Sequence, residues 1–226
     1  MNSDKNNIAH ASVALRPRPS VSIRVHPRHI FASAVLAAAL AGCASPAPPR
    51  DNFYRLEAVP QVRALARPVL PGVLEVSRLD VDGVLSERGL AYQQTDGALA
   101  RYPYDLWSDA PATALQQSLA ETLRDAHTAE QVVTPDLRVP PEWTVRGRLS
   151  RFEYVPARGI VAVKLQLAVV SARDGQLVLL QTYSDERPVQ GAGPEAAVAA
   201  LSRSAAGLFS RFVADLSQAS VPVPRR

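Results

Sequence analysis

The chain contains one cysteine, Cys43, and its thiol is the side chain here that is best suited to covalent chemistry, because an ionised thiol is a strong nucleophile. Leu40-Ala41-Gly42 stands directly before it, and small residues before a scissile bond fit a signal peptidase pocket. An uncharged apolar run, residues 30–40, precedes them. As a helix this run would be about 16 Å long, too short to cross a hydrocarbon core about 30 Å thick. The pattern is typical of a secretory signal that is cleaved at Cys43.

Residues 40–43 resemble the lipobox of bacterial lipoproteins, in which the thiol receives a diacylglyceryl group before cleavage. The resemblance implies that Cys43 becomes the acylated first residue of the mature protein. The apolar run also follows a basic stretch, as the h-region of a signal peptide does, with Arg16, Arg18, Arg24 and Arg28. The alternative interpretation is a short buried helix that ends at a core cysteine. The run length, the upstream charge and the cleavage residues together favour the lipoprotein.

The acyl chains expected on Cys43, palmitate among them, would hold the protein on a membrane, because each buried methylene contributes about 0.8 kcal/mol. Position 44 is Ala and not Asp. In the lipoproteins of Gram-negative bacteria that this motif resembles, Asp there favours retention in the inner membrane. The resemblance therefore implies the periplasmic face of the cell outer membrane. The region before the apolar run is long, so translation could also begin at Val21 or Val25 from an alternative start codon.

Cleavage at Cys43 predicts four segments along the chain. Residues 1–42 form the signal peptide with its lipobox, 43–51 a lipidated tether, 52–218 one domain, and 219–226 a disordered tail. The tether is rich in Pro, Ala and polar residues, and prolines interrupt the tail. The mature chain is long enough for one domain that buries about 70% of its extended-chain surface.

The mature chain is electrically neutral. Removal of residues 1–42 takes away five of the 25 basic and one of the 21 acidic residues, which leaves 20 of each. A neutral domain gives no electrostatic reason to bind nucleic acid. Three of the four histidines also lie in the signal, so His127 remains alone. A His/Cys metal cluster and a disulfide are therefore excluded.

Periodicity along the mature chain predicts an α+β fold, a two-layer sandwich with a mainly antiparallel sheet and two main helices. The predicted order is strands, helix, strands, helix. Early strands are expected at residues 52–59, 72–81 and 130–134, with a hairpin over 89–104 that turns at Asp96-Gly97. Alternating apolar residues predict an antiparallel meander of three long strands, at residues 142–155, 159–172 and 175–189.

Each predicted helix carries one apolar stripe. The first begins at Pro111, with Ser108 or Asp109 as its cap, and ends near Ala126. Its stripe is Leu115, Leu119 and Leu123. The second spans residues 194–218, and its stripe consists of Val198, Leu201, Ala205, Leu208, Phe212 and Leu216.

No motif of the mature chain predicts a catalytic site. His127 lies in a polar stretch and is interpreted as a surface residue, and no nucleophile elbow, Walker loop or dinucleotide-binding glycine motif is present in the sequence. The charged stretch "SDERPV", residues 184–189, predicts a solvated strand end, with a binding role as the alternative.

The stretch "ARYPYDLWSDAP", residues 100–111, combines three aromatic and two acidic residues at a strand-to-helix junction. One interpretation is that Tyr102 and Trp107 fill the core where the helix meets the sheet, because large aromatic side chains bury the most area. The other is contact with a partner. The candidate contact residues are Tyr102, Tyr104, Trp107 and Asp109.

At these residues the mature chain resembles the ABC-type transport auxiliary lipoprotein family, of the paraquat-inducible protein C type. The resemblance rests on the order of four stretches between Cys43 and an Ala-rich final helix: residues 53–58, 72–94, 101–111 and 184–189. Leu106 stands where members usually carry Arg or Lys before the Trp.

The resemblance implies a non-enzymatic role. Such lipoproteins accompany mammalian-cell-entry (MCE) proteins and an ABC transporter that moves lipids between membranes, and at least one branch forms rings. We therefore expect an MCE-domain protein, ABC transporter subunits and further copies of the chain as partners, and no cofactor besides the lipid on Cys43. The alternatives are a stand-alone envelope lipoprotein, such as a peptidoglycan-synthase activator or an outer-membrane assembly factor, and a periplasmic hydrolase with two facing carboxylates.

Overall fold

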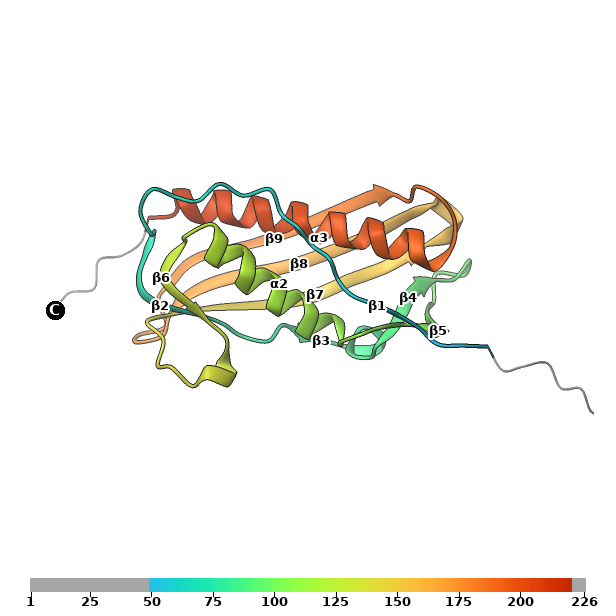
Figure 1. Ribbon diagram of the computed structural model, residues 1–226, viewed down its shortest axis with the longest axis horizontal. Helices are drawn as coiled ribbons and strands as arrows, with labels where there is room; N and C mark the ends of the chain where they lie inside the picture. The colour runs from blue at the N-terminus through green and yellow to red at the C-terminus, as the bar shows by residue number, and fades with distance from the viewer. Residues whose placement is uncertain (1–48, 221–226) are drawn as a thin grey trace, which may run out of the picture. The chain divides into compact units, whose positions relative to one another are not determined.

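A long central strand, β7 (Trp143–Val155), organises the fold of residues 49–220, which are the residues that the computed structural model describes (Figure 1). One edge of β7 pairs antiparallel with β8 (Ile160–Ser171), and β8 pairs antiparallel with β9 (Leu177–Pro188). The predicted meander is therefore confirmed. The signal peptide, Cys43, most of the tether and residues 221–226 lie outside the described residues.

The other edge of β7 pairs with three short strands in turn, and all three run parallel to it. They are β2 (Leu70–Val76), β3 (Asp80–Val81) and β4 (Gly89–Gln93). The single strand predicted over residues 72–81 is thus two strands. At one end of the sheet β6 (Ala129–Val133) runs parallel to β2.

At the other end of the sheet, β5 (Leu99–Trp107) pairs antiparallel with β4 and forms the predicted hairpin, with Gly97 at a φ of 86°. Parallel to β5 runs β1 (Asn52–Tyr54), at the edge. The α+β class and the order of elements are as predicted. The sheet of the described residues is mixed. Every short strand has a parallel neighbour, and β4 and β5 are in addition antiparallel to each other.

One extra residue in β7 shifts the alternation of its side chains, so that apolar side chains face the core in both halves of the strand. Leu149 pairs with Leu165 and Arg151 with Lys164, so Ser150 is unpaired and forms a bulge. The bulge turns Phe152 inward, where its side chain is 1% exposed. Uninterrupted alternation would have placed Arg151 there instead.

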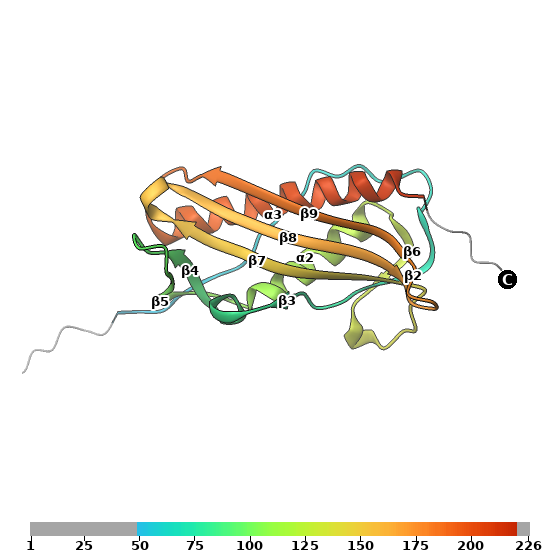
Figure 2. The same ribbon diagram turned by 180° about the vertical axis from the view of Figure 1, so that it is seen from behind.

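Both helices lie on the same face of the sheet, α2 (Pro111–Asp125) beside α3 (Gly193–Gln218), and Figure 2 shows the opposite face of β7, β8 and β9. Every residue of the two predicted stripes is at most 8% exposed, which confirms the faces that the helices bury. The predicted cap of α2 is wrong. Ala110 is the N-cap, without a side-chain hydrogen bond, because the backbone N–H of Ser108 continues the sheet by donating to the Tyr54 carbonyl (2.7 Å). No helix within residues 49–220 is both long enough and apolar enough to span a membrane.

An extended segment, residues 55–69, starts beside α2 and then crosses the outer side of α3, and we call it the strap (Figure 1). Its backbone forms hydrogen bonds with both helices. On α3, Glu57 N–H donates to Ser202 Oγ (3.3 Å) and the Ser210 hydroxyl donates to the Gln61 carbonyl (3.4 Å). On α2, the Ser118 hydroxyl donates to the Ala58 carbonyl (3.2 Å), and just after this helix Leu65 N–H donates to the Ala126 carbonyl (3.0 Å). The strand predicted over residues 52–59 therefore ends at Tyr54. The backbone beyond it finds its partners on serine side chains, which sequence alternation does not report.

Candidate functional site

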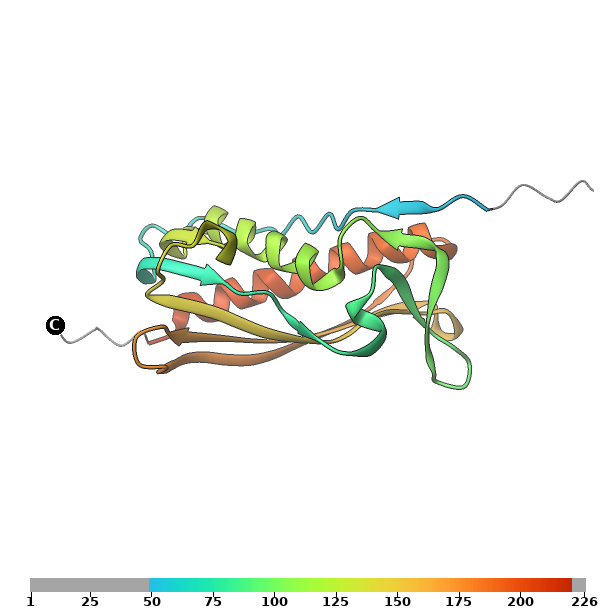
Figure 3. The same cartoon turned by 90° about the horizontal axis from the view of Figure 1, so that it is seen from below.

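The aromatic stretch of residues 100–111 lies where β1, the end of β5 and the start of α2 meet (Figure 3). Tyr54 is the register partner of Trp107, and the Ser108 N–H donates to the Tyr54 carbonyl. On the other side of β5, the Trp107 N–H donates to the Arg88 carbonyl (2.7 Å). The first residues of the domain are thus fixed directly to the residues that precede α2.

Trp107 fills the core at this junction. Its side chain is 2% exposed, and its ring centroid lies 5.4 Å from that of Phe152. The indole Nε1 has no hydrogen-bond partner among the described residues. This placement agrees with the core interpretation of Trp107, since a partner could reach the ring only if the junction opened.

The other three candidate residues lie nearer the surface. Tyr102 is half-buried against Tyr92, with ring centroids 4.5 Å apart, and this burial raises the pKa of Tyr102. Tyr104 is 42% exposed and Asp109 is exposed. Asp109 shares a pocket with Trp107, whereas Tyr102 and Tyr104 do not line it. Contact of these residues with a partner stays a prediction.

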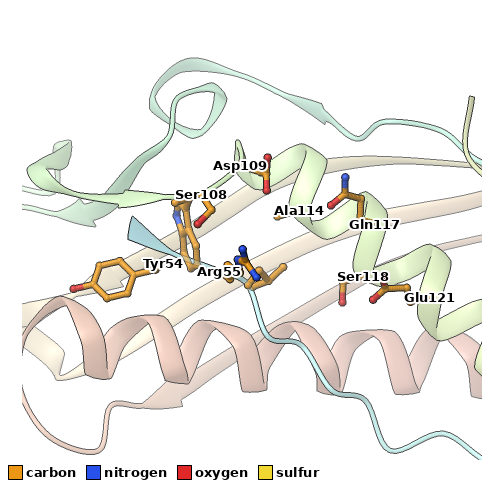
Figure 4. Close-up of a pocket in the computed structure, with 10 residues that line it drawn as sticks. Tyr54, Arg55, Ser108, Asp109, Ala114, Gln117, Ser118 and Glu121 are labelled. Atoms are coloured by element: carbon orange, nitrogen blue, oxygen red, sulfur yellow. The ribbon is translucent and has the colours of Figure 1, made fainter. Parts of the chain in front are cut away.

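The pocket has a volume of about 150 Å³ and lies between the start of the strap and α2 (Figure 4). Polar side chains dominate its walls: Tyr54, Arg55, Ser108, Asp109, Gln117, Ser118 and Glu121. The Tyr54 hydroxyl donates to the Asp105 carboxylate (3.0 Å). Burial, with this hydrogen bond, raises the pKa of Tyr54 to about 12. Sequence reasoning missed Tyr54 and Arg55 as site residues, because only the parallel pairing of β1 with β5 brings them to α2.

The two acids of the pocket stand far apart along α2. Asp109 precedes the first turn, and Glu121 is ten residues after Pro111, so about 15 Å of helix axis separates them. Glycosidase carboxylates, for comparison, lie about 5–10 Å apart. Within residues 49–220, no three His, Cys, Asp or Glu side chains gather closely enough to hold a metal ion.

The charged stretch of residues 184–189 was predicted to be a solvated strand end, but its charged side chains are paired. Asp185 accepts a hydrogen bond from the Ser204 hydroxyl (2.8 Å) of α3, and Arg187 Nε lies 3.2 Å from the same carboxylate. Glu186 faces the opposite side of β9 and pairs with Arg158 (2.6 Å). Two of the three charges therefore fix α3 on the sheet, because α3 packs over this part of β9.

The arrangement of these elements defines a class of two-layer α+β domains for which crystal structures exist. A DUF330-family protein from Xanthomonas campestris is similar at a TM-score of 0.60 and 18% identity, over 72% of this chain and 92% of that chain. A second, uncharacterised protein is similar at a TM-score of 0.59 and 16% identity, over 74% of this chain and 99% of that chain. At these identities the likeness concerns the fold.

The family model of the ABC-type transport auxiliary lipoprotein component matches residues 54–213. Because this match spans more than half of the sequence, the chain belongs to that family. No curated protein matches the chain.

Proposed function

We propose that this protein is the outer-membrane-anchored auxiliary lipoprotein of an MCE-type ABC transport system that moves lipids across the envelope of a Gram-negative bacterium. In this proposal the acyl chains on Cys43 hold it at the periplasmic face. The domain has no catalytic role and contacts an MCE-domain protein and the transporter subunits. The observation that carries the proposal is the family match over residues 54–213.

Two features of the domain support a binding role. The pocket beside α2 lacks a closely spaced acid pair, as described above. In addition, β9 pairs only with β8 among the described residues, and its side chains Leu177 and Leu180 are 53% and 50% exposed. An open strand edge with exposed apolar residues favours pairing with another chain. We expect copies of the protein to associate through this edge.

Affinity purification of the tagged protein from native membranes in a mild detergent, followed by mass spectrometry, tests the proposal. We expect an MCE-domain protein and ABC transporter subunits among the recovered proteins. Recovery of the protein alone, or with a peptidoglycan synthase or an outer-membrane assembly protein, would instead support the stand-alone lipoprotein.

A matched pair of variants tests the predicted contact at the junction. Asp109→Ala removes an exposed acid there, whereas Asp136→Ala removes an exposed acid in η2 (Pro135–Leu137), which follows β6. We expect Asp109→Ala to lower the recovery of the transport components and Asp136→Ala to leave it unchanged. Equal recovery with both variants would remove Asp109 from the contact.

A further inference from the structure

We propose that one side of the β1–β5 pair docks on the membrane surface itself, through four residues that we call the tether-side patch: Phe53, Arg88, Arg101 and Tyr104. This inference rests on the proposed acylation of Cys43. The inference goes beyond acylation, because the protein domain itself, and not only the lipid on Cys43, then contacts the bilayer.

The register of β1 and β5 shows which side of the pair carries the patch. Tyr54 and Trp107 are register partners, and Trp107 is in the core. Side chains alternate along a strand, so Phe53 and its partner Leu106 face the opposite side. Tyr104 stands two residues before Leu106 in β5, and its side chain is exposed.

Arg101 lies on this outward side too. Gly89 is the antiparallel partner of Leu106, so a Cβ atom at Gly89 would point the same way as the Leu106 side chain. Such an atom would lie 2.9 Å from the Cβ of Arg101. The Arg101 side chain therefore covers Gly89, and it pairs with the Glu87 carboxylate.

The patch combines exposed rings with guanidinium groups. Phe53 is 57% exposed and Tyr104 is 42% exposed. The Arg88 guanidinium lies 5.4 Å from the centroid of the Phe53 ring, and its Nε donates to the Trp107 carbonyl (2.9 Å), which fixes the orientation of Arg88. Tyr side chains concentrate at the level of the lipid headgroups, Phe side chains insert just below it, and guanidinium groups bind phosphate. This chemistry fits a phospholipid surface.

The length of the tether favours the same end of the domain. Phe53 is ten positions after Cys43, so the acylated residue lies at most about 36 Å from the patch, and about 31 Å away in the extended conformation that proline-rich linkers adopt. The 26 residues of α3 extend over about 39 Å. Figures 1 and 3 show β1 and β5 at one end of the domain and β6 at the other. The tether therefore keeps the patch within its own length of the bilayer, whereas the β6 end lies at the far end of the domain.

Depth measurements on the acylated full-length protein test this proposal. The acylated Cys43 has no free thiol and the chain has no other cysteine, so a nitroxide attached to Tyr104→Cys is the only label. Leu137→Cys, at a residue 57% exposed in η2, is the matched control. Both proteins are reconstituted on phosphatidylethanolamine/phosphatidylglycerol vesicles, and collisions of the label with a water-soluble nickel chelate and with oxygen are measured by power-saturation EPR. Phe53→Cys, 57% exposed, replaces Tyr104→Cys if that variant does not fold.

We expect nickel accessibility at position 104 to be several-fold lower than at position 137, with higher oxygen accessibility, at every protein-to-lipid ratio. Equal accessibility at the two positions overturns the proposal. Shielding that disappears on dilution into excess lipid also overturns it, because the patch then contacts a second copy of the chain. Mass spectrometry of the N-terminal peptide distinguishes the two proposals. An unmodified Cys43 refutes both the lipid anchor and the membrane contact of the patch. Equal accessibility with an acylated Cys43 refutes the membrane contact alone.

Discussion

Gly147, in the middle of β7, offers the sharpest test of how tightly the sheet is packed. A Cβ atom added there would lie 2.7 Å from the backbone oxygen of Gln166 and 2.7 and 2.8 Å from the terminal methyl carbons of Leu167 and Leu79. The backbone oxygen belongs to the adjacent strand and cannot rotate away. Gly147→Ala must therefore displace β8 or part of the core.

The magnitude follows from two opposing effects. Replacing glycine inside a strand stabilises a protein by about 0.5–1 kcal/mol, because glycine loses more backbone freedom on folding. Overpacking a filled core costs about 1–3 kcal/mol, and contact with a backbone atom lies at the upper end of that range. We therefore expect Gly147→Ala to lower the free energy of unfolding by about 1–2 kcal/mol, and the melting temperature by about 2–8 °C for a chain of this size.

The same substitution at Gly207, in α3, is the matched control. Its added Cβ atom would lie 3.6 Å from the Arg187 guanidinium, which is ordinary contact, and alanine exceeds glycine in helix propensity by about 0.8–1 kcal/mol. Urea denaturation followed by circular dichroism should show Gly207→Ala to be stabilising and Gly147→Ala destabilising. A Gly147→Ala protein as stable as the wild type would refute the close approach of β7 to β8 and Leu79.

Two further predictions concern aromatic residues. Trp143→Phe should destabilise the protein by about 1 kcal/mol more than Trp107→Phe in the same denaturation assay, because Trp143 Nε1 donates to the Pro71 carbonyl (2.9 Å) while Trp107 Nε1 bonds to none of the described residues. Similar losses would mean that this hydrogen bond is not formed in solution. Burial, with the hydrogen bond to Asp105, raises the pKa of Tyr54 from 10.0 to about 12, so between these pH values the unfolded chain binds fewer protons than the folded one. The free energy of unfolding should fall as pH rises through this window, and a Tyr54→Phe protein whose fall is as steep as that of the wild type would refute the assignment.

The long elements could be predicted from the sequence because their side chains repeat with a regular period. The bounds of β7, β8, β9 and α3 differ from the predicted ones by at most two residues. The short strands carry too few side chains for a period to identify their partners. Their parallel pairing depends on which stretch of the β7 edge is free, and this is a property of the whole sheet.

In the candidate site, too, some residues could be predicted from the sequence and others could not. The aromatic composition of residues 100–111 was enough to indicate a helix–sheet junction, and Trp107 fills it. Nothing near that stretch in the sequence indicates Tyr54 or Arg55, which reach the junction only through β1. The prediction for Cys43 rests on its sequence context, since the residue lies outside the described range.

The strap also has a consequence for the order in which the chain folds. Its hydrogen bonds join Glu57 to Ser202 and Gln61 to Ser210, across 145 and 149 residues. Contacts of such sequence separation form slowly, because a long loop must close first. The strap is among the earliest parts of the domain to be synthesised, yet α3, one of its two helical partners, is the last element within residues 49–220. A chain that emerges N-terminus first therefore leaves Glu57 and Gln61 without their α3 partners until synthesis is almost complete, and closure of the strap over α3 is a late folding step.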